Sequence, residues 1–359
     1  MKTCVKKILI NGDFLSRRLT GIERFAYEIT SRLDKLSDKD EIAIAIPSSV
    51  EDVPAFKNLQ IIKLKKKGGS ATRWQLFSLQ GFLLKHREYT ALDFGNFCLP
   101  FTPGIVFLHD IYCELFPKDF KSRREVFERF YSRLLYRVII YRAKKIISVS
   151  NYSRNIIAST FHLDPESISV IYNGWEHLKN VNSDNSVFTD YPELLNPFYF
   201  FLGSLSRRKN IKWIIEYASK NPAAHFVIAG GSLKIVKVDE LFNSLPSNIT
   251  LPGYLDDGKV KALMEKCKAL ILPSYYEGFG IPPLEALSCG AQIIVANAAC
   301  LPEIYGNTAH YIDPFNTDID LDKLIKEPVD PPDEILIKYS HDVSARKLYE
   351  LIKQCQKKF

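Results

Sequence analysis

The spacing of apolar residues along the 359-residue chain predicts short buried strands that alternate with amphipathic helices. Short apolar runs that end at glycine, proline, serine or asparagine are typical of strands buried on both faces. In the C-terminal half these runs cover residues 198–202, 225–229, 248–254, 269–272 and 292–296. Helical spacing between the runs favours a parallel sheet built from repeated strand and helix units.

The N-terminal half shows the same alternation. Residues 7–10 form an apolar run, after which Phe25, Ile29 and Leu33 keep helical spacing. Further apolar runs, which predict three more strands, cover residues 104–108, 146–149 and 170–172. The pattern over residues 343–357 predicts a final helix.

The length of the chain predicts two domains, because a single core rarely organises more than about 250–300 residues. The polar run over 179–186 resembles an exposed linker, and the second domain is expected to start near Pro197. We therefore expect a first domain over residues 1–178, a linker over 179–196, a second domain over 197–338 and a closing helix over 339–359.

Composition disfavours several other classes of protein. Apolar residues make up 46% of the chain, which is enough for two cores. No apolar run reaches the roughly 18 residues of a membrane-spanning helix, and residues 1–8 lack the apolar core of a secretory signal. Seven cysteines without Cys-x-x-Cys spacing are typical of reduced cytoplasmic thiols, not of a disulfide framework or a zinc site.

The segment 275–290 carries two glutamates, Glu277 and Glu285, on either side of a Gly-Phe-Gly turn that follows a predicted strand. Glycine lets the backbone approach a ligand closely, and the N-terminus of the next helix offers unpaired N–H groups to an anion. A carboxylate on each side of such a turn can hold the paired hydroxyls of a sugar and of a ribose, as a nucleotide-sugar site requires. The alternative is that Glu277 caps a turn and Glu285 lies on a solvated helix face.

This arrangement resembles the Glu-x7-Glu element of the retaining glycosyltransferases of family 4 (glycosyl transferases group 1), of the type that builds bacterial surface polysaccharides. The resemblance extends over nearly the whole chain. It implies the GT-B architecture, in which two Rossmann-like, doubly wound α/β domains face a central cleft and a C-terminal helix packs back toward the first domain. It also implies that Glu277 lies by the donor sugar hydroxyls and that Glu285 holds the nucleotide ribose. The backbone at Gly278, Phe279 and Gly280 would lie near the sugar and its diphosphate.

A basic loop follows the predicted strand at 198–202. Arg208 and Lys209 would place positive charge near a helix start, where a diphosphate can bind. The resemblance implies that Lys209 contacts the donor diphosphate, whereas Ser204 stands where many members of the family have arginine. We assign Ser204, Arg208 and Lys209 to donor binding, and leave open which arginine is the second diphosphate ligand. An ordinary solvated basic loop is the alternative.

Candidate residues in the N-terminal half follow two of the predicted strands. Gly21 lies in the loop after the first strand, and the resemblance implies that it approaches the donor. The strand at 104–108 ends in His109 and Asp110, at the edge of a parallel sheet where ligands bind. The resemblance places His109 close to the donor sugar, and we assign it a catalytic role together with Glu277. The residues assigned to acceptor binding are Arg24, Asp110 and Tyr112.

Positive charge is concentrated in the N-terminal half. Residues 1–180 hold 29 Lys and Arg against 19 Asp and Glu, compared with 19 against 22 in residues 181–359. The surplus gathers in the stretches 63–69 and 118–145, the second of which mixes basic and aromatic residues. Such a helix either lies on an anionic membrane surface and meets a lipid-diphosphate acceptor, or is an ordinary amphipathic helix with a solvated basic face. Nucleic-acid binding is disfavoured because no recognised nucleic-acid module is present.

The resemblance leads us to expect a retaining, metal-independent hexosyltransferase that takes a hexose or deoxyhexose, with mannose or rhamnose favoured, from a nucleotide diphosphate sugar. The expected acceptor is a sugar hydroxyl of a lipid-linked oligosaccharide in the biosynthesis of O-antigen or capsule. No cofactor beyond this co-substrate is expected, and Asp318 and Asp320 are not assigned to a metal site. The alternatives are transfer to a soluble acceptor and a non-catalytic GT-B binding protein. The expected location is cytoplasmic, including peripheral association with the inner face of the plasma membrane.

Overall fold

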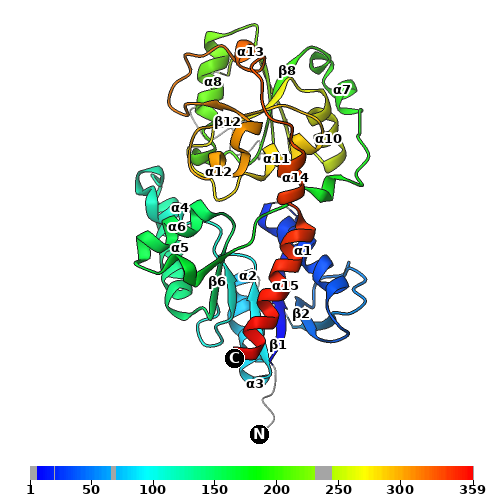
Figure 1. Ribbon diagram of the computed structural model, residues 1–359, viewed down its shortest axis with the longest axis vertical. Coiled ribbons are helices and arrows are strands. Elements are labelled where there is room, and N and C mark those ends of the chain that lie inside the picture. The colour runs from blue at the N-terminus through cyan, green and yellow to red at the C-terminus, as the bar shows by residue number, and fades with distance from the viewer. Residues whose placement is uncertain (1–5, 20, 66–69, 231–244, 359) are drawn as a thin grey trace. The chain divides into compact units, whose positions relative to one another are not determined.

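The computed structural model of the protein describes residues 6–19, 21–65, 70–230 and 245–358. It divides into two compact units (Figure 1). The first unit contains the chain up to Gly174 together with the residues from Ser340 onward, and the second contains Trp175–Tyr339. Each unit has one parallel sheet with helices on both sides of it (Figure 1). This confirms the predicted fold class.

The sheet of the first unit has seven strands in the order β3-β2-β1-β4-β5-β6-β7, all paired in parallel. The strands are β1 Lys7–Asn11, β2 Ile42–Pro47, β3 Gln60–Leu64, β4 Tyr89–Asp93, β5 Ile105–Phe107, β6 Lys145–Ser148 and β7 Ile168–Val170. Strand β1 pairs with β2 on one side and β4 on the other, so the winding of the chain reverses between β1 and β4. Ligands bind at the carboxyl ends of the strands beside such a reversal.

The helices of the first unit follow the apolar spacing of the sequence. They are α1 Gly21–Leu36, α2 Ala71–Arg73, α3 Gln80–Lys85, α4 Tyr112–Leu115, α5 Arg123–Arg142, α6 Asn151–Phe161 and α15 His341–Lys358, with the shorter turns η1 Asp13–Ser16, η2 Trp74–Leu79, η3 Pro117–Asp119 and η4 Pro165–Ser167. In α1 the predicted apolar positions Phe25, Ile29 and Leu33 are all buried. No described helix is both long and apolar enough to cross a membrane.

Helix α15 packs along α1 in the first unit (Figure 1). Arg32 of α1 forms an ion pair with Asp342, and the Phe25 ring lies 6.3 Å from the His341 ring. Midway along α15, the Tyr349 hydroxyl donates to Glu41 Oε2 at 2.8 Å. The last helix thus belongs to the same compact unit as the first strand, although the second unit lies between them in the sequence.

The second unit has a six-stranded parallel sheet in the order β10-β9-β8-β11-β12-β13. Its strands are β8 Phe198–Leu202, β9 His225–Ala229, β10 Ile249–Gly253, β11 Ala269–Leu272, β12 Ile293–Ala296 and β13 His310–Ile312. Its helices and turns are η5 Glu176–Leu178, α7 Val187–Asp190, η6 Pro192–Leu195, η7 Arg207–Lys209, α8 Ile211–Lys220, α10 Asp257–Lys266, α11 Ile281–Ser288, α12 Leu301–Tyr305, η9 Gly306–Thr308, α13 Leu321–Leu324 and α14 Asp333–Lys338. The winding reverses between β8 and β11.

Strands β8, β9 and β11 have the predicted bounds because their apolar runs are continuous and end at breaker residues. Strands β2, β3, β4 and β13 were not predicted. Edge strand β3 alternates little and is mostly exposed, so its sequence resembles a loop. The basic stretch at 63–69 begins at the end of β3, and its residues 66–69 lie outside the described residues.

The polar run 179–186, expected to be a linker, lies against α10 in the second unit. Lys261 donates to the Leu178 and Val181 carbonyls at 3.2 and 2.8 Å, and the Asp184 amide donates to the Gly258 carbonyl at 3.0 Å. The second unit accordingly begins at Trp175, earlier than Pro197. The segment is polar because it runs over the surface of the second unit, where its backbone forms hydrogen bonds with α10.

Candidate functional site

The loops that follow β8 and β11 lie together at the carboxyl edge of the second sheet. These strands are neighbours, so the parallel topology brings their ends to one place. The Tyr275 amide donates to the Arg208 carbonyl at 3.1 Å, and Asn210 Nδ2 donates to the Pro273 carbonyl at 3.0 Å. The basic loop and the segment that opens the Glu-x7-Glu element are therefore bonded to each other.

Glu277 forms ion pairs with both cations of the basic loop. Lys209 Nζ lies 2.6 Å from Glu277 Oε1, and Arg208 Nη1 lies 2.9 Å from Glu277 Oε2. Lys209 is only 8% exposed and Glu277 only 4%. The alternatives of a freely solvated basic loop and of a turn-capping glutamate therefore do not describe these two residues.

The charges of this group determine how Glu277 ionises. Burial raises the pKa of Glu277, but attraction by Lys209 and then Arg208 outweighs it and holds the pKa below its ordinary value. Glu277 is therefore ionised at neutral pH. Two cations against one carboxylate leave a net positive charge at the carboxyl edge of the sheet, and an anion such as a diphosphate would compensate this charge.

The Gly-Phe-Gly turn is buried and held in one conformation. Gly280 has a φ of +82°, in the left-handed region, and a Cβ at this position would lie 2.7 Å from Leu301 Cδ2. The Tyr305 hydroxyl donates to the Gly280 carbonyl. Helix α11 starts directly after Gly280, and of its first three residues only Ile281 carries an N–H, because the next two are prolines. Only glycine satisfies both the backbone angle and the space at position 280.

Glu285, on α11, is also buried and paired. Its Oε1 lies 3.1 Å from Nε2 of His177, with the two side chains 12% and 6% exposed. The alternative of a solvated Glu285 is therefore wrong, because the side chain turns into the unit instead of out to solvent. His177 was missed in the sequence because a single histidine far along the chain from its partner forms no local pattern.

Ser204, which was assigned to donor binding, lies in the loop that follows β8. It is exposed, and its hydroxyl lies 3.2 Å from Ser206 Oγ. Arg208 instead is the arginine that reaches Glu277. Asp320, which was not assigned to a metal, caps α13 by accepting from the Lys323 amide at 3.0 Å.

A hollow of about 420 Å³ adjoins this edge of the sheet, at the ends of β12 and β13. Its lining includes Asn297, Asp313 and Pro314. Asn210 Nδ2 donates to the Pro314 carbonyl at 2.7 Å, which ties the basic loop to the wall of the hollow. A larger hollow of about 820 Å³ lies at the amino ends of β8, β9 and β10. Ligands of open parallel sheets bind at carboxyl ends, so the smaller hollow is the relevant one.

In the first unit, His109 follows β5 and is buried. Its Nε2 lies 2.7 Å from the Phe94 carbonyl, and its ring packs edge-on against Phe25 at 5.9 Å. A carbonyl only accepts, so Nε2 carries the hydrogen and Nδ1 is the acceptor of the ring. Burial lowers the pKa of His109, which keeps the ring neutral. The ring can therefore accept a hydrogen bond from a sugar hydroxyl through Nδ1.

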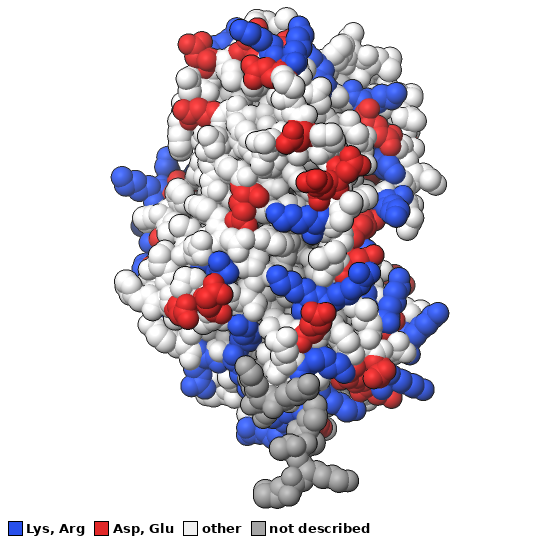
Figure 2. All heavy atoms as spheres, viewed as in Figure 1, with Lys and Arg blue, Asp and Glu red and all other residues white. Residues whose placement is uncertain are grey.

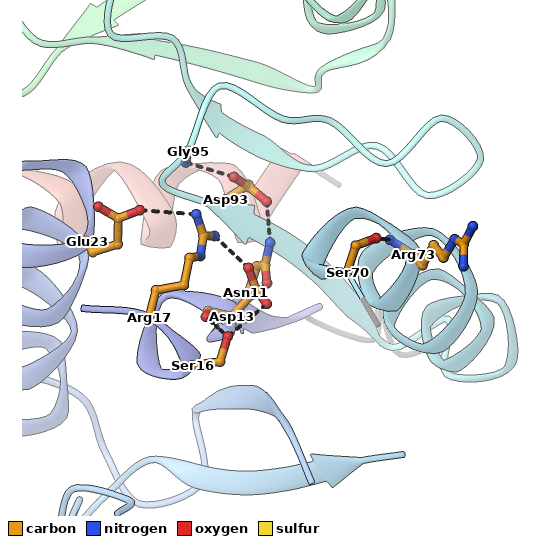
Figure 3. Close-up of polar contacts among 9 residues, drawn as sticks. All are labelled: Asn11, Asp13, Ser16, Arg17, Glu23, Ser70, Arg73, Asp93 and Gly95. Atoms are coloured by element: carbon orange, nitrogen blue, oxygen red, sulfur yellow. Dashed lines mark hydrogen bonds and ion pairs between the residues drawn. The ribbon is translucent and has the colours of Figure 1, made fainter. Parts of the chain in front are cut away.

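A polar network lies at the carboxyl ends of β1 and β4, on either side of the reversal in the first sheet (Figure 3). Asn11 Nδ2 donates to Asp93 Oδ2 at 2.6 Å, and Arg17 bridges Asp13 at 2.5 Å and Glu23 at 3.1 Å. Burial raises the pKa of Asp93 to about 6, against the hydrogen bonds from Asn11 and the Gly95 amide. This network was not assigned from the sequence, although it occupies the position where ligands of such sheets bind.

The remaining candidates of the first unit have local roles in the structure. Gly21 opens α1 with a φ of +41° and open space around it, so its need for glycine is conformational. Arg24 lies half-buried on α1. Asp110 Oδ1 accepts from the Tyr112 amide at 3.0 Å, and the Tyr112 hydroxyl donates to Asp119 at 2.6 Å. Acceptor binding by these residues stays a prediction.

Comparison with known proteins agrees with this architecture. Residues 19–177 match Glycosyltransferase Family 4, and residues 193–339 match glycosyl transferases group 1. The chain is 29% identical over 329 residues to the O-antigen chain mannosyltransferase RfbU of Salmonella typhimurium, covering 86% of this chain and 87% of that protein. It is 24% identical over 338 residues to the O-antigen chain mannosyltransferase B of Escherichia coli, covering 87% and 88% of the two chains.

A solved structure has the same fold. Alr3699/HepE of Anabaena, in complex with UDP and glucose, superposes with a TM-score of 0.68 at 16% identity, covering 97% of this chain and all of that one. The two family matches fall on the two units in turn, and together they span most of the chain. Glu277 and Glu285, the two glutamates of the Glu-x7-Glu element, lie in the second match. The chain therefore belongs to family 4 of the glycosyltransferases (glycosyl transferases group 1), with the GT-B fold.

Proposed function

We propose that the protein is a retaining, metal-independent glycosyltransferase that moves a hexose or deoxyhexose from a nucleotide diphosphate sugar to a sugar hydroxyl of a lipid-linked oligosaccharide. The observation that carries the proposal is the ion-paired group of the buried Glu277 and Lys209 with the partly buried Arg208, at the carboxyl edge of the second sheet. Its excess positive charge suits a diphosphate, and its carboxylate suits the hydroxyls of the attached sugar.

The reaction breaks the bond between the anomeric carbon and the diphosphate oxygen. Negative charge then grows on the departing diphosphate, where Arg208 and Lys209 stabilise it more than in the bound donor. The acceptor oxygen bonds to the anomeric carbon on the same face, and its proton passes to the departing diphosphate. These cations supply the charge that a metal ion supplies in other transferases, hence the proposed metal independence.

Glu277 would orient the donor sugar while its charge is balanced by the two cations. Each of its oxygens already lies beside one cation, and a carboxylate oxygen has two lone pairs, so it can still accept from a hydroxyl. Glu277 also stabilises the positive charge that develops on the sugar ring as the bond breaks. His109 would contact the sugar or the incoming hydroxyl through Nδ1.

Mannose is the favoured donor sugar because the relatives from Salmonella typhimurium and Escherichia coli are both named as mannosyltransferases of the O-antigen chain. A deoxyhexose such as rhamnose from its dTDP donor is the second choice. The same relatives support a role in the assembly of surface polysaccharide, whose growing chains are carried on a lipid diphosphate.

Helix α5 supports an acceptor at an anionic membrane surface, but not through the face expected from the sequence. Arg133 Nε and Arg137 Nη1 pair with Glu114 at 2.8 and 3.2 Å, and Arg129 Nε donates to the Cys113 carbonyl at 3.0 Å. Three arginines of the helix are thus bonded to the protein. The alternative of a freely solvated basic face therefore does not describe the middle of α5, where these arginines are paired.

The surface that α5 exposes instead is largely apolar. Its exposed large apolar side chains are 37% to 79% exposed, and they are Val126, Phe127, Phe130, Tyr131, Leu134 and Tyr141. Exposed cations stand at both ends of this surface, with Lys121, Arg123 and Arg124 before it and Arg142 after it. On the face shown in Figure 2, by contrast, basic and acidic side chains are interspersed. Aromatic side chains flanked by cations fit an anionic lipid surface.

Nucleoside diphosphate release tests the proposed reaction. GDP-mannose, dTDP-rhamnose and UDP-glucose are offered with a lipid-linked or a soluble oligosaccharide, with and without EDTA, to the wild type, Glu277→Ala and the exposed control Glu216→Ala. We expect one donor to be consumed with the lipid-linked acceptor, with EDTA and Glu216→Ala leaving the rate unchanged, Glu277→Ala removing turnover, and the product keeping the donor's anomeric configuration. Consumption of no donor would indicate a binding protein, and equal use of the soluble acceptor would remove the lipid from the proposal.

Sedimentation with vesicles tests the membrane surface separately. The wild type should bind vesicles that contain phosphatidylglycerol and not those of phosphatidylcholine alone, and Phe127→Ser combined with Leu134→Ser should weaken this binding while turnover of a soluble acceptor is unchanged. Equal binding of the variant and the wild type would exclude this face of α5.

A further inference from the structure

We propose that His177 is a positioning residue, which fixes the carboxyl group of Glu285 for the ribose hydroxyls of the donor nucleotide. The inference rests on the proposed function, in which Glu285 binds that ribose. The new element is the residue that holds Glu285 in place. His177 lies before the second family match and contributes to none of the motifs of the donor site.

The geometry of the pair fixes its hydrogen. His177 Nε2 lies 3.1 Å from Glu285 Oε1. A carboxylate oxygen only accepts, so Nε2 of the histidine carries the hydrogen and donates it. One oxygen of Glu285 is thereby anchored, and the orientation of the other oxygen follows from it. An unanchored glutamate loses side-chain freedom when it binds a ligand, and a glutamate that is already held loses less.

His177 is itself held by the backbone around it. Two residues earlier, Trp175 Nε1 donates to the Leu336 carbonyl at 3.0 Å. The next residue, Leu178, is buried, and its carbonyl accepts from Lys261 at 3.2 Å. The turn η5 is therefore anchored to α14 and α10 of the same unit. The histidine is a fixed support and not a surface side chain that changes orientation.

Helix α11 connects this support to the rest of the donor site. Glu285 lies on the helix that begins directly after Gly280, so the turn near the diphosphate and the ribose-binding carboxyl belong to one rigid element. His177 contacts this helix at Glu285, five residues after Gly280, whereas Lys209 pairs with Glu277 before the helix begins. Loss of His177 should thus weaken the hold on the nucleotide without disturbing the groups that act on the breaking bond.

A purely structural role makes a different prediction from a positioning role. If the pair only stabilised the second unit, substitution of His177 would lower the unfolding temperature and leave the nucleotide affinity of the folded protein intact. If His177 positions Glu285, the affinity for the nucleoside diphosphate falls, the donor KM rises and kcat is nearly unchanged. A glutamine at this position, whose amide can donate to Oε1, should restore the affinity.

Titration calorimetry separates these cases, using whichever of GDP, UDP and dTDP binds the wild type most tightly. We expect His177→Ala to bind it about tenfold more weakly, which corresponds to about 1.4 kcal/mol, and His177→Gln to bind nearly as the wild type does. The control is His225→Ala, which removes a half-buried histidine at the opposite edge of the same sheet. Steady-state kinetics should show the rise in KM with kcat within about twofold.

Glu285→Ala distinguishes failure of this inference from failure of the proposed function. If Glu285→Ala weakens nucleotide binding and His177→Ala does not, His177 has no positioning role and the donor site stands. If Glu285→Ala binds as the wild type does, Glu285 does not hold the ribose, and both statements fall. Should His177→Ala not fold, His177→Asn replaces it, because its shorter amide does not reach Oε1. Its binding should then be about tenfold weaker than that of His177→Gln.

Discussion

Replacement of Asp93 by asparagine tests whether burial controls the polar network of the first unit. Asparagine has nearly the shape of the protonated carboxyl group, and its side-chain oxygen can still accept from Asn11. The variant thus removes the charge of Asp93 and keeps one of its two hydrogen bonds, because an amide nitrogen cannot accept from the Gly95 amide. Because burial raises the pKa of Asp93 to about 6 from 3.8, the folded protein binds this proton more tightly than the unfolded chain does.

The sign and size of the effect follow from this difference. A carboxyl group with a raised pKa contributes stability that is complete below about pH 4 and is lost as the pH rises through about 6. One pKa unit corresponds to about 1.4 kcal/mol, so a shift of about two units amounts to about 3 kcal/mol. The asparagine variant does not lose this contribution. Its free energy of unfolding should therefore rise relative to the wild type by about 3 kcal/mol between pH 4 and pH 7.

Urea unfolding at several pH values measures this difference. Trp74 is fully buried in the first unit, and replacing Trp175 and Trp213 by phenylalanine makes the fluorescence report on that unit alone. The exposed Asp52→Asn serves as the control for loss of a carboxyl group. A difference between Asp93→Asn and the wild type that stays constant from pH 4 to pH 7, or falls, would refute the reasoning.

Two further predictions concern the second unit. Gly280→Ala should lower the free energy of unfolding more than Gly290→Ala, because both glycines have a φ near +80° but only at Gly280 would a Cβ meet a neighbour, at 2.7 Å. We expect the two variants to differ by about 1–3 kcal/mol in their free energy of unfolding, measured by chemical denaturation. Equal losses of stability would show that the residues around Gly280 move aside at no energetic cost. Glu277→Gln should destabilise the protein by about 3–5 kcal/mol at pH 7, since the buried Lys209 and the partly buried Arg208 lose their partner. Because the pKa of Glu277 is lowered, this loss of stability should shrink as the pH falls below 4.5. Thermal unfolding of the variant and the wild type at pH 7 and pH 4 measures it, and an equal loss at both pH values would contradict the prediction.

The sequence predicts those parts of the fold that depend on local pattern. The continuous apolar runs of β8 and β11 define these strands, and breaker residues define their ends. The sequence also placed Lys209 and Glu277 in loops that follow two predicted strands. It did not predict that Glu277 pairs with both cations, because this depends on β8 and β11 being neighbours in the strand order.

Contacts between distant single residues could not be predicted. Asn11 and Asp93 meet because β1 and β4 are adjacent, and His177 meets Glu285 because the chain enters the second unit beside α11. Neither pair belongs to a local motif. Such pairs follow from tertiary packing, in which buried polar groups must find partners wherever the fold provides them.

The direction of side chains on α5 was a further limit. The sequence shows how many arginines the helix has but not which way they point. Arg133 and Arg137 turn to Glu114, which is mostly buried and needs a cation. The apolar side chains Phe127 and Leu134 are exposed in consequence. Composition left open whether α5 lies on a membrane or has a solvated basic face. Which side chains the helix exposes depends on Glu114, the acidic residue of α4.

The central claim is that Lys209 and Arg208, the two cations beside Glu277, hold the donor diphosphate. Binding of a nucleoside diphosphate to Lys209→Met tests this claim most directly. Lys212→Met is the matched control, because it removes the same charge from an exposed lysine three residues later. Titration calorimetry with GDP, UDP and dTDP should show one nucleotide bound by the wild type and by Lys212→Met with equal affinity. Lys209→Met should bind it at least about tenfold more weakly, as expected for loss of a charged hydrogen bond. Equal affinity of Lys209→Met and the wild type, or an equal loss in Lys212→Met, would contradict the account.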